Sequence, residues 1–192
     1  GGLDPRPAHY VAMLREAYTA IHTADATASV IAAALAPTVE RGPDNLSDVL
    51  YLRAIYDLGG RDFLDAAAGK PYGFDTGPDD RRVDESVLNF SRLILLREEM
   101  VRRGDGHKPL WGSNFAEEQR RYTRDAYERA RREWPWVGGL ILQHWEPDAP
   151  ADDPIRGFAV APRVAEWLAG GLRLRDDALI PGQHPAQNAH TV

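Results

Sequence analysis

Short apolar runs that alternate with amphipathic helical patterns constrain this chain more than any other feature. Four apolar runs are spaced along it, at 28–35, 65–68, 109–115 and 137–143. Helical periodicity lies before and between them, at 7–23, 47–58, 85–103 and 117–133. Runs without polar alternation are typical of parallel strands that are buried on both faces. The chain is therefore predicted to form a parallel α/β sheet with helical crossovers.

Two architectures satisfy this pattern, a doubly wound open sheet and a (β/α)8 barrel. Their strands are equally apolar, so periodicity does not separate them. The chain has 192 residues, whereas a complete barrel usually needs about 250. Pattern and length alone therefore favour the open sheet.

Composition excludes several classes of function. The net charge of −6 argues against a general nucleic-acid binder, which needs a basic face. Cysteine is absent, which excludes disulfides, thiolate metal sites and a cysteine nucleophile. The histidines lack metal-ligand spacing, so no metal and no cofactor is expected. No apolar run approaches the roughly 20 residues of a membrane-spanning helix.

A series of local motifs is spaced along the chain, at 10–18, 24–27, 48–53, 56–59, 63–66, 71–73, 108–115, 134–138, 142–145 and 157–158. In their order and spacing these motifs are similar to those of the clan A glycosidases, in particular families 5 and 39. In those enzymes the corresponding segments run from just after the fourth strand to the loop after the eighth. The resemblance therefore implies a (β/α)8 TIM barrel, with about strands 5–8 in residues 1–170 and a C-terminal tail at 171–192.

Two positions depart from the motifs of these glycosidases. Segment 108–115 resembles their seventh strand, usually Lys-Pro-Val-Trp-x-x-Glu-Phe-Gly-Trp, in which the glutamate is the nucleophile. Asn114 stands at that position. Their sixth strand commonly ends in His-Pro-Tyr-Gly, and here Lys70 replaces the histidine.

The resemblance also implies that half of the barrel lies elsewhere. Strands one to four are missing, together with the Asn-Glu motif that supplies the acid/base. Phe115 runs almost directly into the helical pattern at 117, although such loops normally take about 2–6 residues. Four strands cannot close an eight-stranded barrel. We therefore expect a fragment, or a protein that needs the missing N-terminal half, from a secreted or cell-envelope bacterial setting.

The catalytic chemistry expected from the resemblance is incomplete. Glycoside hydrolysis generally uses two carboxyl groups, one as acid and one as nucleophile or base. The amide of Asn114 is neutral and a poor nucleophile. Glu146, just after the last strand, is the best carboxylate at a strand end. The alternative interpretation, a solvated loop acid or a partner of Arg156, is the commoner situation for such residues.

Aromatic and polar residues near the strand ends form a candidate carbohydrate-binding set. Aromatic faces stack on the C–H faces of sugar rings, and amide, imidazole or ammonium groups bond hydroxyls. The candidate residues are Lys70, Tyr72, Trp111, Gln143, His144 and Trp145. The alternatives are that the tryptophans pack in the core and that the histidine is structural. Two functions stay open, a glycosidase and a catalytically inactive barrel that binds carbohydrate or acts as a scaffold.

Two further segments carry structural predictions. Trp134 and Trp136 flank Pro135 before the last strand, and we interpret both as packing residues. The strongly charged segment 117–133 predicts an outer helix face with i,i+4 ion pairs. Ser47 is expected to cap the helix that comes after it.

Overall fold

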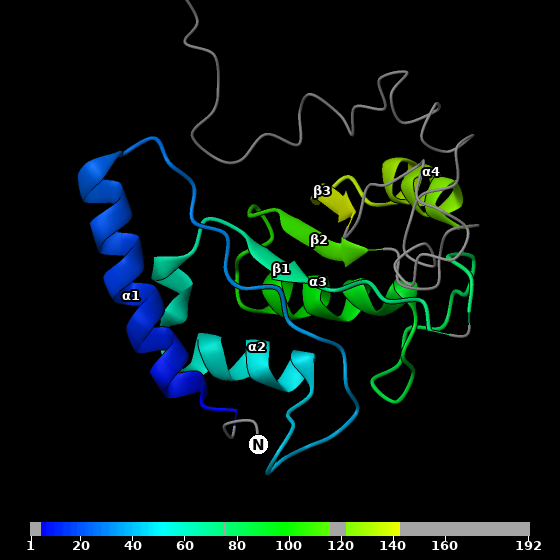
Figure 1. The fold of residues 1–192 in the computed structure, drawn as a ribbon, viewed down its shortest axis with the longest axis horizontal. Coiled ribbons are helices and arrows are strands. Elements are labelled where there is room, and N and C mark those ends of the chain that lie inside the picture. Colours follow the sequence, from blue (N-terminus) through cyan, green and yellow to red (C-terminus); the bar gives the residue numbers. More distant parts are fainter. Residues whose placement is uncertain (1–4, 75, 116–121, 143–192) are drawn as a thin grey trace, which may run out of the picture.

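The computed structural model describes residues 5–74, 76–115 and 122–142, and these form a mixed α/β arrangement around a small parallel sheet (Figure 1). The described elements are α1 (Pro7–Ala24), α2 (Asp48–Asp57), η1 (Gly60–Phe63), β1 (Ala67–Gly69), η2 (Phe90–Arg92), α3 (Leu93–Arg102), β2 (Leu110–Phe115), α4 (Thr123–Glu133) and β3 (Val137–Leu142). The predicted helix near 162–168 and the tail at 171–192 lie outside the described residues, as does the start of the helix predicted from 117.

The sheet confirms the prediction of parallel strands. Its order is β1-β2-β3, with Ala67 beside Leu110 and Leu110 beside Val137. The sequence predicts a strand at 28–35, but this segment forms only two isolated parallel bridges, from Ile31 to Ala66, just before β1, and from Leu35 to Gly69 of β1. It therefore lies along the outer side of β1 without forming a continuous ladder.

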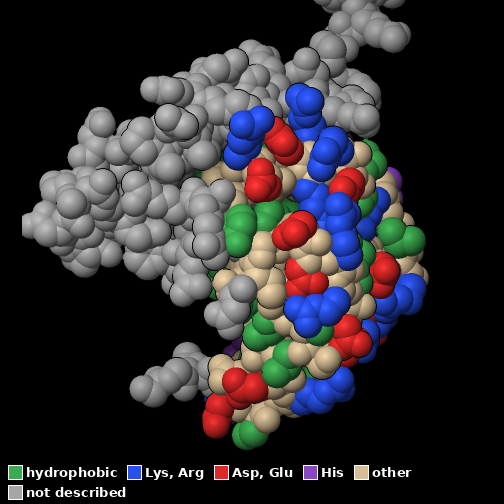
Figure 2. Space-filling view, turned by 90° about the vertical axis from the view of Figure 1, so that its right-hand side faces the viewer, with side chains coloured by type: hydrophobic (Ala, Val, Ile, Leu, Met, Phe, Trp, Pro, Cys, Tyr) green, Lys and Arg blue, Asp and Glu red, His purple; other side chains and the backbone are tan. Residues whose placement is uncertain are grey.

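The surface that Figure 2 shows carries basic and acidic side chains that are interspersed. Ion pairs join α2 to the loop after β1 and to the end of α3, with Arg53 Nη2 3.5 Å from Glu85 and Arg103 Nη1 2.6 Å from Asp57. A continuous basic stripe of the kind that binds a phosphate backbone is absent from the described residues on this face.

The described helices pack on one face of the sheet. Helices α2, α3 and α4 share a buried cluster with Ala67, Leu110 and Val137. Helix α1 packs on Val30 and Ala32. These residues flank Ile31, which bridges Ala66, so they lie on the same face of the sheet as Ala67.

Neighbouring strands follow one another in chain order. The described sheet therefore has no reversal of strand order of the kind that a doubly wound sheet requires.

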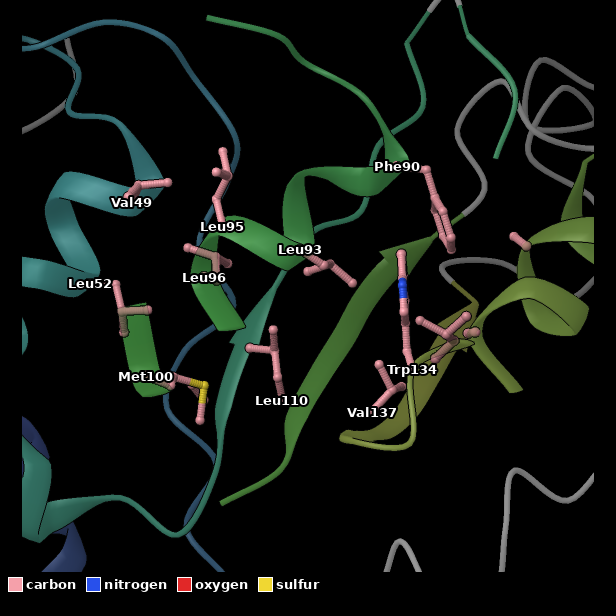
Figure 3. Packing of buried hydrophobic residues seen from close by; sticks show 14 of the residues in the cluster. Val49, Leu52, Phe90, Leu93, Leu95, Leu96, Met100, Leu110, Trp134 and Val137 are labelled. Carbon is pink, nitrogen blue, oxygen red and sulfur yellow. The ribbon is translucent and has the colours of Figure 1, made fainter. Parts of the chain in front are cut away.

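Glycines in the strands let α3 approach the sheet closely. A Cβ atom on Gly69 would lie 2.6 Å from Leu96 and 2.9 Å from Leu93. Figure 3 shows these leucines beside Leu110 and Met100 in the layer between α3 and the sheet. A larger side chain at Gly69 would force this layer apart.

Stacked aromatic rings close the core at the β3 end. The Phe90 and Trp134 rings stack with centroids 4.9 Å apart, and Trp134 stacks on Trp136 at 5.3 Å (Figure 3 labels the first two). The prediction that both tryptophans are packing residues is confirmed.

A buried guanidinium at Arg92 joins the loops that come after segment 28–35 and strand β1. Its Nε and Nη2 bind the Asp48 carboxylate at 2.7–3.1 Å, and both side chains are 3% exposed. Nη1 donates to the carbonyls of Glu85 and Val87, each at 2.9 Å, and Nη2 donates to that of Thr38 at 3.0 Å. Every nitrogen of the guanidinium therefore has an acceptor, as a buried charge requires.

This contact explains two errors of the sequence-based prediction. The helix predicted from 85 begins at Leu93, because the carbonyls of Glu85 and Val87 bond Arg92 and not a helical ladder. Ser47 stands at the N-cap of α2, but its hydroxyl makes no capping bond. That oxygen instead accepts from Arg92 Nη2 at 3.3 Å.

A second buried arginine, Arg129, anchors the loop after β1 to α4. It is 3% exposed and donates to Ser91 Oγ at 2.8 Å and to the carbonyls of Pro78 and Asp80. The i,i+4 pair with Glu133 is present at 3.0 Å, as expected from the charged pattern. However, α4 buries Arg129 against the core, so this part of the segment is not an outer face.

Substitution of Arg92 tests the importance of the buried contact. Arg92→Met leaves the Asp48 carboxylate buried without its partner, so we expect a loss of about 3–5 kcal/mol in the free energy of unfolding. Arg82→Met removes a pair between Asp80 and an arginine whose side chain is 62% exposed, and it should cost less than the Arg92 substitution, about 1 kcal/mol. Urea unfolding of both variants measures the difference. Equal losses would show that the Arg92 contact is not special.

Glu133 should give the fold a distinct acid dependence. A hydrogen bond from Arg81 Nη2 at 2.8 Å and one from Arg129 lower the pKa of its carboxyl group to about 2. Because the pKa of this carboxyl group is lower in the folded than in the unfolded protein, the ionised carboxylate stabilises the fold. This stabilisation is complete above the ordinary glutamate pKa of about 4.3, and it is lost as the pH falls through about 2. We expect the stability gap between the wild type and Glu133→Gln to be constant above pH 5 and to close near pH 2.

Urea unfolding at several pH values measures this gap. In an Arg81→Gln background, the same Glu133→Gln substitution should produce a smaller gap, because the main cause of the lowered pKa is gone. A wild-type gap that persists unchanged at pH 2 would contradict the assignment.

Candidate functional site

The carboxyl ends of the described strands meet at one edge of the sheet, and we call this the carboxyl edge. Lys70 directly follows β1, with Tyr72 two residues further, and Asn114 is the penultimate residue of β2. The strands are parallel neighbours, so these positions lie at the same edge. Strand β3 ends there at Leu142, the residue before Gln143.

Several predicted site residues are not among those that the structure describes. Gln143, His144, Trp145 and Glu146 lie outside the described residues, and so does the side chain of Asn114. Their roles stay predictions, and the structure locates only the strand ends next to which they stand in the sequence.

The loop 70–74 presents an aromatic pair at the carboxyl edge. Its start is fixed because the Lys70 N–H donates to the Leu35 carbonyl at 3.0 Å, and the Tyr72 N–H donates to the Lys70 carbonyl at 2.8 Å. The Tyr72 and Phe74 rings then meet edge to face, with centroids 5.9 Å apart and planes at 83°. This is a favourable geometry for an aromatic pair.

Phe74 is a residue that the sequence analysis missed. Its backbone has a φ of 47°, in the left-handed region, and its side chain is 40% exposed. A bulky residue in this region is strained by about 1–3 kcal/mol, and such strain often occurs at functional sites. The sequence feature that could have pointed to Phe74 is an aromatic residue in the loop after a predicted strand. Only the structure shows its backbone strain and its exposure.

Trp111 takes a different position from the one expected. The prediction placed it at or near the carboxyl end of its strand, but it is the second residue of β2. It pairs with Gly139, and its ring lies over Gly138 and Gly139, where Cβ atoms would come within 2.8 Å and 2.7 Å of ring carbons. The indole nitrogen is buried and has no hydrogen-bond partner among the described residues. Trp111 therefore packs β2 against β3, and a role in sugar binding stays a prediction.

Asp48 is not a candidate acid catalyst, although burial raises the pKa of its carboxyl group. The bonds from Arg92 oppose this effect and occupy both carboxylate oxygens. A carboxylate held in this way is structural.

The described part of the chain shows no metal centre and no transmembrane element. No group of three or more histidine, aspartate or glutamate residues in it is placed to hold a metal ion. None of its helices combines the length and the apolar character needed to cross a bilayer.

Comparison of the chain with protein-family models, with curated proteins and with solved structures gave no match. Inference about function therefore rests on the geometry of the carboxyl edge and on the sequence motifs.

The strain at Phe74 predicts an unusual order of stability. Phe74→Gly should be more stable than Phe74→Ala by about 1 kcal/mol, because both lose the ring but only glycine adopts a positive φ without strain. Val83 is comparably exposed at 38% and is not among the positive-φ residues, so Val83→Gly should be less stable than Val83→Ala. Thermal and urea unfolding of the four variants decide this. If the glycine and alanine variants had the same order of stability at both positions, Phe74 would not be strained.

Proposed function

We propose that this chain forms part of a glycosidase-like (β/α)8 barrel whose carboxyl edge binds carbohydrate. The supporting observation is the sequential order of segment 28–35, β1, β2 and β3, with the described helices on one face. A (β/α)8 barrel is built from parallel strands in chain order with an outer ring of helices. In that architecture the loops at the carboxyl edge form the ligand site.

The loop 70–74 is the part of this edge that best suits a sugar. Tyr72 and Phe74 offer aromatic surface at right angles to each other, and Phe74 is exposed. Sugar rings have apolar C–H faces that stack on such surfaces. Lys70, which is partly buried at the base of the loop, supplies an ammonium donor for hydroxyl groups. Gln143, His144 and Trp145 would complete the site from the end of β3.

Asn114, at the position of the nucleophile, bears on whether such a barrel only binds carbohydrate or also hydrolyses it. Its neutral amide cannot form a glycosyl-enzyme intermediate by the ordinary carboxylate route. We therefore favour a carbohydrate-binding barrel without ordinary retaining catalysis. The second candidate is an active O-glycosidase that uses Glu146, whose place in the sequence after β3 is the observation in its favour.

Binding of neutral oligosaccharides tests the first part of the proposal. Titration of the 192-residue chain with cello-, manno- and xylo-oligosaccharides, followed by NMR, should shift the backbone amides of Lys70, Tyr72 and Phe74. Tyr72→Ala and Phe74→Ala should each weaken binding several-fold, since aromatic contacts of this kind contribute about 0.5–1.5 kcal/mol. Leu58→Ala is the matched control, because Leu58 is 44% exposed at the far end of α2. Absence of binding, or equal effects of all three variants, would contradict the proposal.

Hydrolysis of aryl glycosides tests the catalytic part. We expect no turnover by the wild type and a measurable gain in Asn114→Glu, because that variant restores a carboxylate at the nucleophile position. Wild-type turnover that Glu146→Gln abolishes would instead establish the second candidate.

A further inference from the structure

A cavity of about 440 Å³ opens beside the loop that comes after segment 28–35. It lies between the loop after segment 28–35 and the first turn of α2, and its lining includes Leu35, Thr38, Asp48 and Tyr51. Leu35 bridges Gly69, the last residue of β1, so the cavity begins where the strands end. Its volume is within the range of small-molecule sites, about 300–1,000 Å³.

The walls of this cavity are fixed before any ligand arrives. Arg92 holds two of them, through the Thr38 carbonyl at 3.0 Å and the Asp48 carboxylate. The Glu40 carboxylate accepts from Asn45 Nδ2 at 3.1 and 3.2 Å, and the Glu40 carbonyl accepts from the N–H of Ser47 at 2.7 Å. A prearranged site lowers the entropic cost of binding.

The lining combines an aromatic ring with oxygen acceptors. Tyr51 supplies a partly buried ring, and prolines and leucines supply apolar surface. Glu40 and Asp44 supply carboxylates, and the third carboxylate, Asp48, is neutralised by Arg92. Among the described residues that line the cavity, none is a lysine or an arginine. An anionic ligand would therefore meet uncompensated negative charge.

We propose that this cavity is a subsite for one sugar ring without an anionic substituent, and that it excludes uronic acids and sulfated sugars. The proposal rests on the carbohydrate function proposed above and adds a charge specificity to it. Tyr51 stacks on the ring, and Glu40 and Asp44 accept hydrogen bonds from its hydroxyls. The loop 70–74 then contacts the neighbouring part of the same chain of sugars.

Monosaccharide binding followed by NMR tests this subsite. Glucose, mannose and N-acetylglucosamine are the probes, and glucuronic acid is the anionic comparison. At least one neutral probe should shift the amides of Thr38, Asn45 and Tyr51, whereas glucuronic acid should bind at least tenfold more weakly. Tyr51→Leu should weaken the neutral probe at least fivefold. Urea unfolding of this variant shows whether the fold persists.

Charge neutralisation provides a second variant that keeps the fold, because both acidic residues are exposed. Glu40→Gln with Asp44→Asn should strengthen glucuronic acid binding at least fivefold. The matched control is Asp57→Asn with Asp62→Asn, which removes the same charge from exposed positions at the opposite end of α2 and in η1. An equal gain in the control would refute the charge specificity of the cavity.

The two proposals fail in different ways. If oligosaccharides shift residues 70–74 but no probe shifts residues 38–51, the subsite is wrong and the carbohydrate function stands. If no sugar shifts either segment, both are wrong.

Discussion

The buried pair of Arg92 and Asp48 is the interaction on which the carboxyl edge depends. One guanidinium joins α2 to the loops after segment 28–35 and β1, and it bonds backbone carbonyls from both. A buried charge is tolerated only when all its donors are used, so these loops have little freedom to rearrange separately. The cavity wall at Thr38 and the late start of α3 at Leu93 both result from this requirement.

The opposite edge of the sheet has another buried charge with a different consequence. Asp105 is fully buried, accepts hydrogen bonds from Tyr56 at 3.0 Å and Arg61 at 2.9 Å, and forms an ion pair with Lys108 at 3.0 Å. This cluster ties the segments that enter β1 and β2. Phe74, whose backbone is strained by a positive φ, lies at the carboxyl edge. Buried charges therefore stabilise the fold at both edges of the sheet, and the strained aromatic residue lies at the carboxyl edge.

One backbone hydrogen bond connects the two proposed sugar contacts. The loop 70–74 and the cavity of segment 36–51 are joined by the bond from the Lys70 N–H to the Leu35 carbonyl. Neither contact needs Asn114 as a nucleophile. A barrel that lost ordinary catalysis would keep both, because aromatic stacking and hydroxyl recognition do not depend on the nucleophile. Binding and turnover are therefore separate questions for this chain.

The sequence by itself determined the elements whose pattern is local. Helix α1, strand β2 and strand β3 begin at or next to the residues where the apolar periodicity places them, and the parallel pairing is expected from strands that alternate with helices. Tertiary structure alone decided the burial of Arg92 and Arg129 and the strain at Phe74. The physical reason is that a sequence pattern reports which residues avoid water. It does not report which distant carbonyls will surround a charge, or which loop residue will take an unfavourable φ.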